Sequence, residues 1–373
     1  MTPRIAHLFP DSPFLRFTAE TFETAAPGAN TFLVYASTGD LARHGLPPEL
    51  PVATLAAGAE GLDRAHEVIG DSQIAVFHSV GAFAAQVLSR APRDTLKVWS
   101  GWGGDYYGSD WSAMAGLLDP LTSSYERQRL TIPGKIHHTY RRRRPARLLR
   151  AAARTADVFS APIPDDFDVF RRRFPAFRGR YAQLNYASVE DTYAVGAEII
   201  SGEDILVGNS ATMPNNHLDI FELLAHADVA NRRIITPLSY GDDAYAEVVT
   251  ERGRTLFGDA FVPLREFLPL AEYQALIAGC STVVMGHRRQ QGVGNVASAL
   301  WSGAHVILHD RSPLFAFLRS RGAHVTPLSA VAEAGIPRER ISPEGLAENR
   351  RVLREFWSRD RVLANIRELI DSV

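Results

Sequence analysis

Short apolar runs rich in β-branched and aromatic residues alternate along the chain with stretches whose apolar residues recur at helical spacing. This alternation is typical of parallel sheets covered by helices. In the first half the predicted strands are Ile5–Phe9, Thr31–Tyr35, Ile74–His78 and Leu96–Trp99, and the predicted helices include Phe14–Thr24 and Ala82–Arg90.

A second series of the same kind occupies the second half of the chain. Its predicted strands are Ile205–Val207, Arg233–Thr236, Thr282–Met285 and Val306–Leu308, and its predicted helices are Leu218–Ala225, Asp243–Arg252, Leu270–Ala278 and Val296–Trp301.

The segment between the two series, Ser188–Asp204, is acidic and weakly periodic, so we place the domain junction near it. The pattern predicts an α/β protein with two doubly wound, Rossmann-like domains and a cleft between them, where ligands bind at the carboxyl ends of the strands. The predicted domains are residues 1–195 and 196–345. Residues 346–373 are predicted to be helices that cross back toward the first domain.

The bulk composition excludes several classes of protein. Of 373 residues, 46% are hydrophobic and 22% are charged, which is typical of a globular chain. The formal net charge of −2 predicts no long-range attraction to nucleic acid. Cys280 is the only cysteine, which excludes an internal disulfide and suits a reducing compartment. Because the N-terminus lacks a signal-peptide pattern and no long apolar run occurs, we predict a cytoplasmic protein.

The sharpest local signal is residues 285–297, MGHRRQQGVGNVA, which follow a strand and begin a helix. Glycines let the backbone approach a ligand closely, and a helix N-terminus offers N–H groups and partial positive charge to a phosphate. Arginines before the glycines add charge-assisted phosphate contacts. The alternative is a plain strand-to-helix turn, since short glycine patterns occur by chance. The predicted ligand-binding residues here are Arg289, Gln291, Gly292, Val293, Gly294 and Asn295.

The same segment also satisfies the dinucleotide pattern G-x-G-x-x-A, with Asp310 after the next strand. That fingerprint normally opens the first βαβ unit of its domain, whereas this one follows a late strand. An NAD(P)-dependent oxidoreductase therefore remains an alternative, but a less favoured one.

A second turn follows the first strand of the second domain. Gly208, Asn209 and Ser210 are small or hydrogen-bonding residues that can face a ligand's phosphates. The alternative is an ordinary helix cap made by Asn209, Ser210 or Thr212.

In the first half, residues 98–108, VWSGWGGDYYG, crowd aromatic residues and glycines around one carboxylate. The faces of Trp102 and Tyr107 can stack on sugar rings, and Asp105 can orient or deprotonate a hydroxyl group. The alternative is an aromatic-packed loop in which Asp105 caps the next helix.

Residues 135–156 are strongly basic and contain no acidic residue. Their helical spacing and an apolar flank at Leu148, Leu149 and Ala152 predict a helix attracted to anionic lipid headgroups. No nucleic-acid module accompanies them, and the alternative is a solvated basic face. The arginines on the predicted face are Arg143, Arg147, Arg150 and Arg154.

No metal site is predicted. Asp166 and Asp168 form a D-x-D pattern of the kind that binds metal-nucleotide, but they follow a proline-rich turn and suit a helix N-cap. Asp242-Asp243 likewise begins a predicted helix. The twelve histidines show no metal-ligand spacing.

Together these segments resemble the bacterial TDP-4-acetamido-4,6-dideoxygalactose:lipid II transferases of enterobacterial common antigen synthesis, the 4-alpha-L-fucosyltransferase family. The likeness is carried by ILVGNS at 205–210, PLSY at 237–240, RQQGVG at 289–294 and WGGDYY at 102–107. It covers most of the chain and is strongest from Ile205 to Leu318. The resemblance implies a GT-B fold, a TDP-sugar donor, and an acceptor sugar on undecaprenyl pyrophosphate at the inner face of the membrane. It adds Tyr240 to the donor site, and the fold places Phe267 and Leu268 beside the base.

One position favours TDP separately from the resemblance. Many GT-B enzymes place a glutamate eight residues after the first acidic residue of E-G-F-G, where it accepts both ribose hydroxyls. Counting from Gln291 reaches Ala299 instead. A 2′-deoxyribose has no diol, so the missing carboxylate costs nothing for thymidine and is costly for uridine or guanosine.

The predicted function is metal-independent transfer of an acetamido- or amino-dideoxyhexose from TDP to a lipid-linked saccharide, without a cofactor. The enzyme would be peripheral on the anionic inner membrane surface and would not bind nucleic acid. The departing pyrophosphate would be stabilised by Arg289 and the helix N-terminus, and Asp105 would act on the acceptor hydroxyl. A non-catalytic sugar-nucleotide-binding partner is the other alternative.

Overall fold

The computed structural model describes residues 2–35, 41, 45–46, 49–108, 114, 116–129, 145–195, 199–229 and 231–373. The chain forms two compact units, each built on a parallel sheet. Unit 1 comprises Met1–Met114, Pro133–Ala187 and Arg359–Val373, and unit 2 comprises Ala115–Ile132 and Ser188–Ser358. The predicted α/β class with two Rossmann-like domains is confirmed.

Among the described residues, unit 1 contains a seven-stranded sheet with the order β3-β2-β1-β4-β5-β6-β7. The chain winds outward from β1 in one direction and then from β4 in the other, so the switch point lies at the carboxyl ends of β1 and β4. The strands are β1 (Ile5–Pro10), β2 (Asn30–Tyr35), β3 (Val52–Thr54), β4 (Ile74–His78), β5 (Leu96–Ser100), β6 (Val158–Ser160) and β7 (Arg180–Tyr181).

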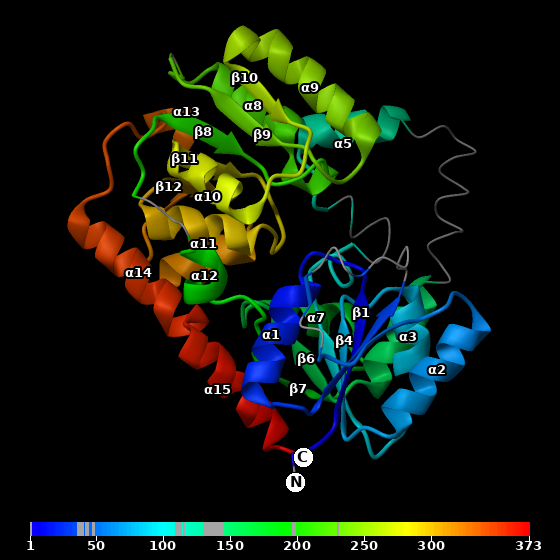
Figure 1. The fold of residues 1–373 in the computed structure, drawn as a ribbon. Helices are drawn as coiled ribbons and strands as arrows, with labels where there is room; N and C mark the ends of the chain where they lie inside the picture. Colours follow the sequence, from blue (N-terminus) through cyan, green and yellow to red (C-terminus); the bar gives the residue numbers. More distant parts are fainter. Residues whose placement is uncertain are drawn as a thin grey trace. The chain divides into compact units, whose positions relative to one another are not determined.

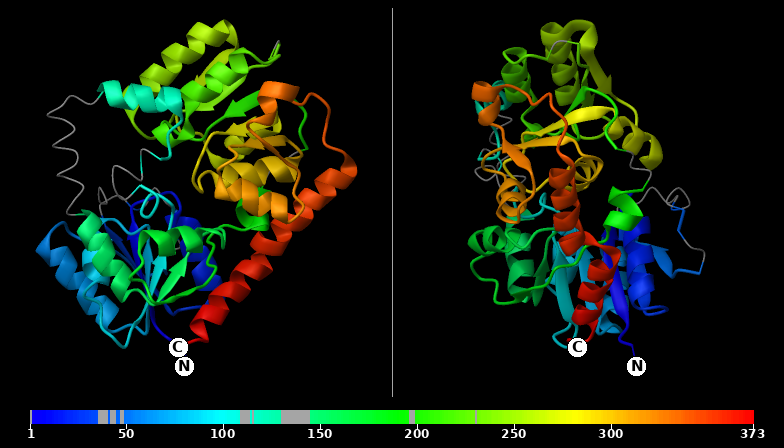
Figure 2. Two further views of the ribbon diagram at one scale, coloured as in Figure 1. Left: turned by 180° about the vertical axis from the view of Figure 1, so that it is seen from behind. Right: turned by 90° about the vertical axis from the view of Figure 1, so that its left-hand side faces the viewer.

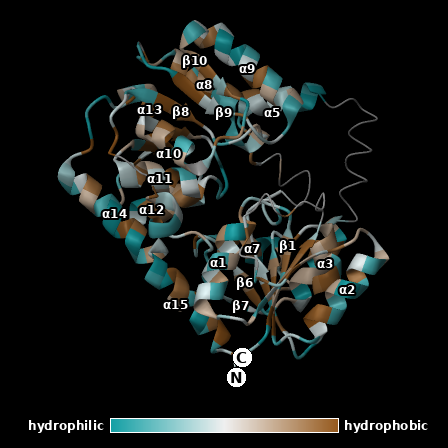
Figure 3. Ribbon diagram, viewed as in Figure 1, coloured by the Kyte–Doolittle hydropathy of each residue, from teal (hydrophilic) through white to brown (hydrophobic). Residues whose placement is uncertain are grey.

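Helices cover the sheet of unit 1 because their apolar stripes need burial. Alternating apolar residues of α1 pack with residues of α15, the last helix of the chain, over β1 and β4. Figure 1 shows α15 lying alongside α1, and Figure 3 shows hydrophobic strands inside and hydrophilic outer helix faces. The helices are α1 (Leu15–Ala25), α2 (Ala59–Gly70), α3 (Ala82–Leu88), residues 145–155, α7 (Asp166–Arg173) and α15 (Arg359–Ile370).

The sheet of unit 2 has the order β10-β9-β8-β11-β12-β13 within the described ranges. Its switch point lies at the carboxyl ends of β8 and β11, which are neighbours in the sheet. The two predicted phosphate-binding turns follow these two strands. The strands are β8 (Asp204–Val207), β9 (Ile234–Pro237), β10 (Phe261–Leu264), β11 (Cys280–Met285), β12 (His305–Leu308) and β13 (Val325–Pro327).

Helices lie on both faces of this sheet (Figure 2). On one face α5 contacts α8, and α8 contacts α9; on the other, α11 contacts α10 and α14. None of the helices within the described ranges is long and apolar enough to cross a membrane. The helices are α5 (Pro120–Arg129), α8 (His217–Ala225), α9 (Asp243–Phe257), α10 (Leu270–Ala278), α11 (Val293–Ser302), α12 (Pro313–Ser320), α13 (Ala330–Ala334) and α14 (Pro343–Trp357).

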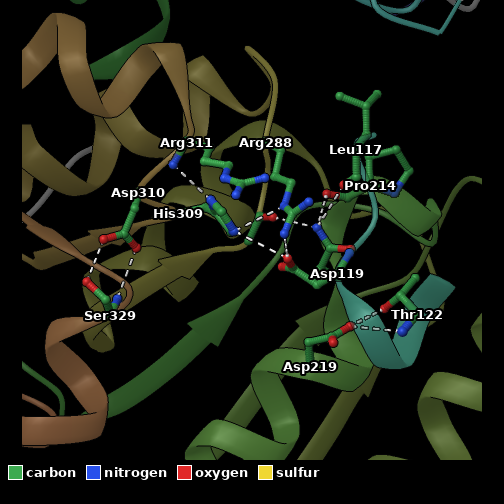
Figure 4. A network of polar contacts seen from close by, with 12 residues as sticks. Leu117, Asp119, Thr122, Pro214, Asp219, Arg288, His309, Asp310, Arg311 and Ser329 are labelled. Carbon is green, nitrogen blue, oxygen red and sulfur yellow. Dashed lines mark hydrogen bonds and ion pairs between the residues drawn. The ribbon is translucent and has the colours of Figure 1, made fainter. Parts of the chain in front are cut away.

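The units differ from the predicted domain ranges at α5, which belongs to unit 2 although its sequence lies between segments of unit 1. The backbone N–H groups of Leu121 and Thr122 donate to the Asp219 carboxylate at 2.8 and 2.9 Å, so Asp219 of α8 caps the N-terminus of α5 (Figure 4). A cap supplied from 97 residues away leaves no local pattern in the sequence.

Two further divisions separate the units. The chain passes into unit 2 at Ser188, where the predicted junction begins. Of the C-terminal helices, α14 belongs to unit 2 and α15 belongs to unit 1, so the final crossing falls at Arg359 rather than at residue 346.

Candidate active site

The turn after β8 brings polar groups to the switch point of unit 2. Gly208 has φ +71°, and a Cβ there would lie 2.5 Å from His217 Nε2, so only glycine fits. The backbone N–H of Asn209 donates to Asn215 Oδ1 at 2.9 Å, and Asn215 Nδ2 donates to Ser210 Oγ at 3.2 Å. This turn is therefore held by the buried Asn215, a residue that sequence analysis missed.

Three predicted residues from three different strand ends meet at this turn. Gln291, after β11, donates through Nε2 to Asn209 Oδ1 at 3.0 Å and to Thr212 Oγ1 at 3.3 Å. Asn209 Nδ2 donates to the hydroxyl oxygen of Tyr240, after β9, at 3.1 Å. Asn209, Tyr240 and Gln291 thus form one polar surface at the carboxyl edge of the sheet.

The N-terminus of α11 lies on the same edge. Gly292 is its N-cap residue, with φ +67°, and it provides no side chain to cap the helix. The first turn contains no acidic residue. Arg289 Nε donates to Gln291 Oε1 at 2.7 Å, which places the guanidinium beside the helix start. Partial positive charge from the helix and full charge from Arg289 therefore coincide.

His287 was also missed by sequence analysis. It is buried, and its Nε2 lies 2.8 Å from Asn215 Oδ1, an acceptor, so Nε2 carries the proton. Burial lowers the pKa of His287 well below its usual value, and the Arg289 charge lowers it further. This histidine is therefore neutral and links the turn after β8 to the turn after β11.

Arg288, next to it, is engaged within the protein (Figure 4). It forms an ion pair with Asp119, which precedes α5, and the same carboxylate lies 3.4 Å from His309 Nε2. The N–H of Arg311 donates to His309 Nδ1 at 2.9 Å, and Arg288 Nε donates to His309 Nε2 at 3.3 Å. Arg288 is thus bound to Asp119, whereas Arg289 lies beside the N-terminus of α11 and is the candidate for a phosphate contact.

The predicted base-binding residues lie in the loop between β10 and α10. Phe267 is 68% exposed, which leaves its ring available to a ligand. On α11, Asn295 Nδ2 donates to the Tyr273 hydroxyl at 2.7 Å. Ala299 is fully buried in that helix.

The dinucleotide alternative needs a carboxylate at Asp310 that can bind a ribose. Both oxygens of Asp310 instead accept from Ser329, one from its backbone N–H and one from its hydroxyl. Figure 4 shows this pair. These two hydrogen bonds tie Asp310 to Ser329, at the start of α13, and occupy the carboxylate that a ribose would need.

In unit 1, Asp105 lies in the loop of residues 101–108 that follows β5, here called the Asp105 loop. Its Oδ2 accepts from Trp99 Nε1 at 2.8 Å and from the N–H of Val80 at 3.2 Å, and its Oδ1 accepts from the N–H of Trp102 at 3.1 Å. Burial raises the pKa of Asp105, and these hydrogen bonds oppose the shift. Asp105 is only 7% exposed, and its Oδ1, with one of these three donors, is the oxygen with capacity for a further hydrogen bond.

The two predicted acceptor-binding aromatics have different surroundings. Trp102 is partly exposed and contacts the rings of Phe14 and Tyr186, with centroids 5.4 and 5.8 Å away. Tyr107 is buried, and its hydroxyl donates to Asp166. Trp102 is thus the one whose ring borders solvent, beside the exposed Phe14.

The basic segment is described from residue 145 onward; Arg143 lies outside the described residues. In the helix of residues 145–155, Arg147, Arg150 and Arg154 are exposed. Of the predicted apolar flank, Leu149 and Ala152 are buried in the core of unit 1 instead of facing a membrane, and Leu148 is half-buried. The exposed side chains of this helix are therefore those of the three arginines.

The two pairs of aspartates that precede predicted helices differ in whether they cap the helix. Asp242 caps α9 by accepting from the N–H of Tyr245, as predicted. At α7, Asp165 occupies the N-cap position without a side-chain cap, and Asp166 turns into the protein. Over the described ranges, no group of three or more His, Cys, Asp or Glu side chains is arranged to hold a metal ion.

Solved structures with this architecture cover the whole chain. Sucrose-phosphate synthase from Thermosynechococcus elongatus has a TM-score of 0.67 and 10% identity, with 99% of each chain covered. Anabaena HepE in complex with UDP and glucose has a TM-score of 0.65 and 13% identity, over 99% of this chain and 100% of that one. A glycosyltransferase from Rickettsia africae has a TM-score of 0.65 and 9% identity, over 100% and 99%. The fold is that of the GT-B glycosyltransferases.

The family is given by a sequence comparison. The model of the 4-alpha-L-fucosyltransferase family, glycosyl transferase group 56, matches residues 63–328, which is more than half of the chain. The chain belongs to this family and is a glycosyltransferase.

Proposed function

We propose that this glycosyltransferase takes an acetamido- or amino-dideoxyhexose from a TDP-sugar and transfers it to a lipid-linked saccharide. The observation that supports the donor half is the switch point of unit 2. There, an uncapped helix N-terminus, Arg289 and the Asn209–Gln291–Tyr240 surface face one edge of the sheet. This is the chemistry that a nucleoside diphosphate requires.

Catalysis would rest on stabilising the departing diphosphate. The α11 N-terminus and Arg289 supply positive charge where negative charge develops, and their positions are fixed before the donor arrives. Charge from these groups makes a metal ion unnecessary in the proposed mechanism. Asp105 would accept the proton of the acceptor hydroxyl through Oδ1, and burial raises the pKa of this carboxyl, which makes its ionised form a stronger base.

The first prediction concerns the nucleotide. TDP is expected to bind more tightly than UDP or GDP, because Ala299 offers no carboxylate to a ribose diol. HepE, which has the same fold, is bound to UDP, so the uridine nucleotide is the proper competitor. Thermal shift followed by calorimetry measures this, since a ligand at 100 times its Kd stabilises by about 2.7 kcal/mol. Equal or tighter binding of UDP would contradict a TDP donor, and a response to NADH alone would contradict the transferase assignment of the site.

The second prediction concerns the membrane, where a lipid-linked acceptor must stay. The exposed Arg147, Arg150 and Arg154 support an electrostatic attraction to anionic headgroups, worth about 1 kcal/mol per basic residue. Replacing all three with glutamine should reduce sedimentation with anionic vesicles by at least about tenfold and leave TDP affinity unchanged. Added salt should weaken the wild-type binding.

A matched control replaces Arg233, Arg254 and Arg319, three exposed arginines of unit 2, with glutamine, which removes the same charge elsewhere. Vesicle binding that falls equally in both triple variants would mean that net charge alone is responsible. Unchanged binding in the first variant would show the three arginines to be a solvated face.

A further inference from the structure

Asp166, the first carboxylate of the D-x-D pattern, has an internal role. It is 0% exposed at the start of α7. The hydroxyl of Tyr106 donates to its Oδ2 and the hydroxyl of Tyr107 donates to its Oδ1, both at 2.6 Å. Each carboxylate oxygen therefore accepts one phenol from the Asp105 loop. Tyr106, Tyr107 and Asp166 are called the phenol–carboxylate cluster below.

The same loop is attached on its other side by Asp105. That carboxylate accepts from Val80, after β4, and from Trp99, in β5. Three consecutive side chains, those of residues 105, 106 and 107, thus make buried hydrogen bonds to three separate elements. Within the loop, the backbone N–H groups of Tyr106 and Tyr107 donate to Gly103 O at 3.3 and 2.9 Å.

We propose that Asp166 is a positioning residue for the transfer reaction: by accepting both phenol hydroxyls, it fixes the Asp105 loop and with it the Asp105 carboxylate. The part of this proposal that concerns the transfer reaction rests on the proposed function of Asp105. The control of the loop by Asp166 rests on the hydrogen bonds of the cluster.

The charged and titratable groups around Asp166 define how the cluster responds to pH. Burial raises the pKa of Asp166 to about 7, the two phenol bonds oppose this shift, and the charges of Asp165 and Asp105 add to it. Tyr181, from β7, is also within electrostatic reach of Asp166, and its hydroxyl donates to Ala161 O. Both the ionised and the neutral carboxyl can accept the two phenols.

The sign follows from the raised pKa. In the closed loop, burial keeps Asp166 neutral below about pH 7. Opening of the loop that admits water to Asp166 removes this burial, and the pKa of the carboxyl returns toward its ordinary value near 4. Closure is therefore most favourable below about pH 4 and weakens as the pH rises through about 7.

Hydrogen–deuterium exchange of residues 101–108 in the full-length protein tests this, with rates corrected for intrinsic pH dependence. Asp166→Asn should speed exchange of the loop by roughly tenfold at pH 5.5, because the amide offers only one acceptor to two phenols. It should also remove most of the change in protection between pH 5.5 and 7.5. Tyr107→Phe should speed exchange similarly, and Tyr181→Phe, whose phenol is not bonded to Asp166, should change it by less than about twofold.

The control of the loop by Asp166 would be overturned if residues 101–108 exchanged at the wild-type rate in both Asp166→Asn and Tyr107→Phe. It would also be overturned if Tyr181→Phe speeded exchange as much as these two substitutions do. If Asp166→Asn does not fold, the exchange rate of residues 101–108 in Tyr107→Phe tests the control of the loop by itself. Steady-state kinetics test the positioning role separately from the control of the loop. Asp166→Asn should lower kcat and leave the KM for the donor unchanged. A loosened loop with unchanged kcat would overturn the positioning role. If the wild-type enzyme transferred no sugar from a TDP-sugar donor, the proposed function would be contradicted. The exchange data would still show whether Asp166 controls the Asp105 loop.

Discussion

Replacing Arg289 with alanine is expected to weaken TDP binding by about 10- to 100-fold and to leave thymidine binding nearly unchanged. A hydrogen bond to a charged group contributes roughly 1.5–3 kcal/mol, and only the diphosphate presents that charge. Arg289 lies beside the start of α11, where its guanidinium and the helix act on the same anion. Calorimetric titration with TDP and with thymidine measures both affinities.

Arg233→Ala is the matched control. Arg233 precedes β9, at the amino edge of the same sheet, and its side chain is 63% exposed beside Asp204. Its loss should leave both affinities within about twofold of wild type. If Arg289→Ala weakened TDP and thymidine equally, the arginine would be holding the turn after β11 rather than the diphosphate.

The second large effect is expected in acid. Within the described residues, four buried histidines have a lowered pKa: His7 and His78 in unit 1, and His217 and His287 in unit 2. Burial lowers the pKa of His7 and of His217 to about 3, and it lowers the pKa of His78 and of His287 well below the usual value. Unfolding restores the ordinary value near 6.5. The stability from these rings is therefore complete above pH 6.5 and is lost as the pH falls below it.

At pH 5 each ring costs about 2 kcal/mol, so the two rings in each unit cost about 4 kcal/mol, close to the lower end of the total stability of an ordinary domain, about 5–15 kcal/mol. Asp166 acts in the opposite direction, because its raised pKa favours the folded state as the pH falls from about 7 toward 4. Its gain offsets about one histidine at pH 5. We expect cooperative unfolding with net proton uptake as the pH falls to about 5.

Urea unfolding at pH 8 and pH 5 measures the loss. His217→Gln should reduce the difference between the two pH values by about 2 kcal/mol, whatever its effect at pH 8. His226→Gln, at a side chain 79% exposed, should leave the difference unchanged. A wild-type protein equally stable at pH 8 and pH 5 would contradict the assignment of neutral buried rings.

Sequence patterns placed the central strands well and missed the edges of the sheets. Strand β4 and helix α10 have the predicted bounds, since both combine an unbroken apolar pattern with clear limits. The strands without a prediction include β3, β7, β10 and β13, which are the outermost strands of the two sheets. Their residues are mostly half-buried or exposed, and β10 and β13 each contain a proline, which an edge strand tolerates. An edge strand therefore carries too weak a local signal.

Some residues of the candidate site could also be predicted from the sequence, and others could not. The glycines, Arg289, Gln291 and the turn at Asn209 were visible in the sequence, because a phosphate site at a strand end needs those residue types in one short segment. Asn215, His287 and Asp119 were not, because each acts through a partner far along the chain: Asn215 contacts His287 across 72 residues. Polar residues without a local pattern give no sign of such pairs.

By itself, then, the sequence determined the α/β class, the two sheets and the position of the phosphate-type turns, since periodicity and turn chemistry are local properties. Only the tertiary structure decided that α5 joins unit 2, that Arg288 pairs with Asp119, and that Asp166 turns inward to two tyrosines. The reason is physical: a buried carboxylate is stable only where donors or cations are brought to it, and the fold, not the neighbouring residues, brings them.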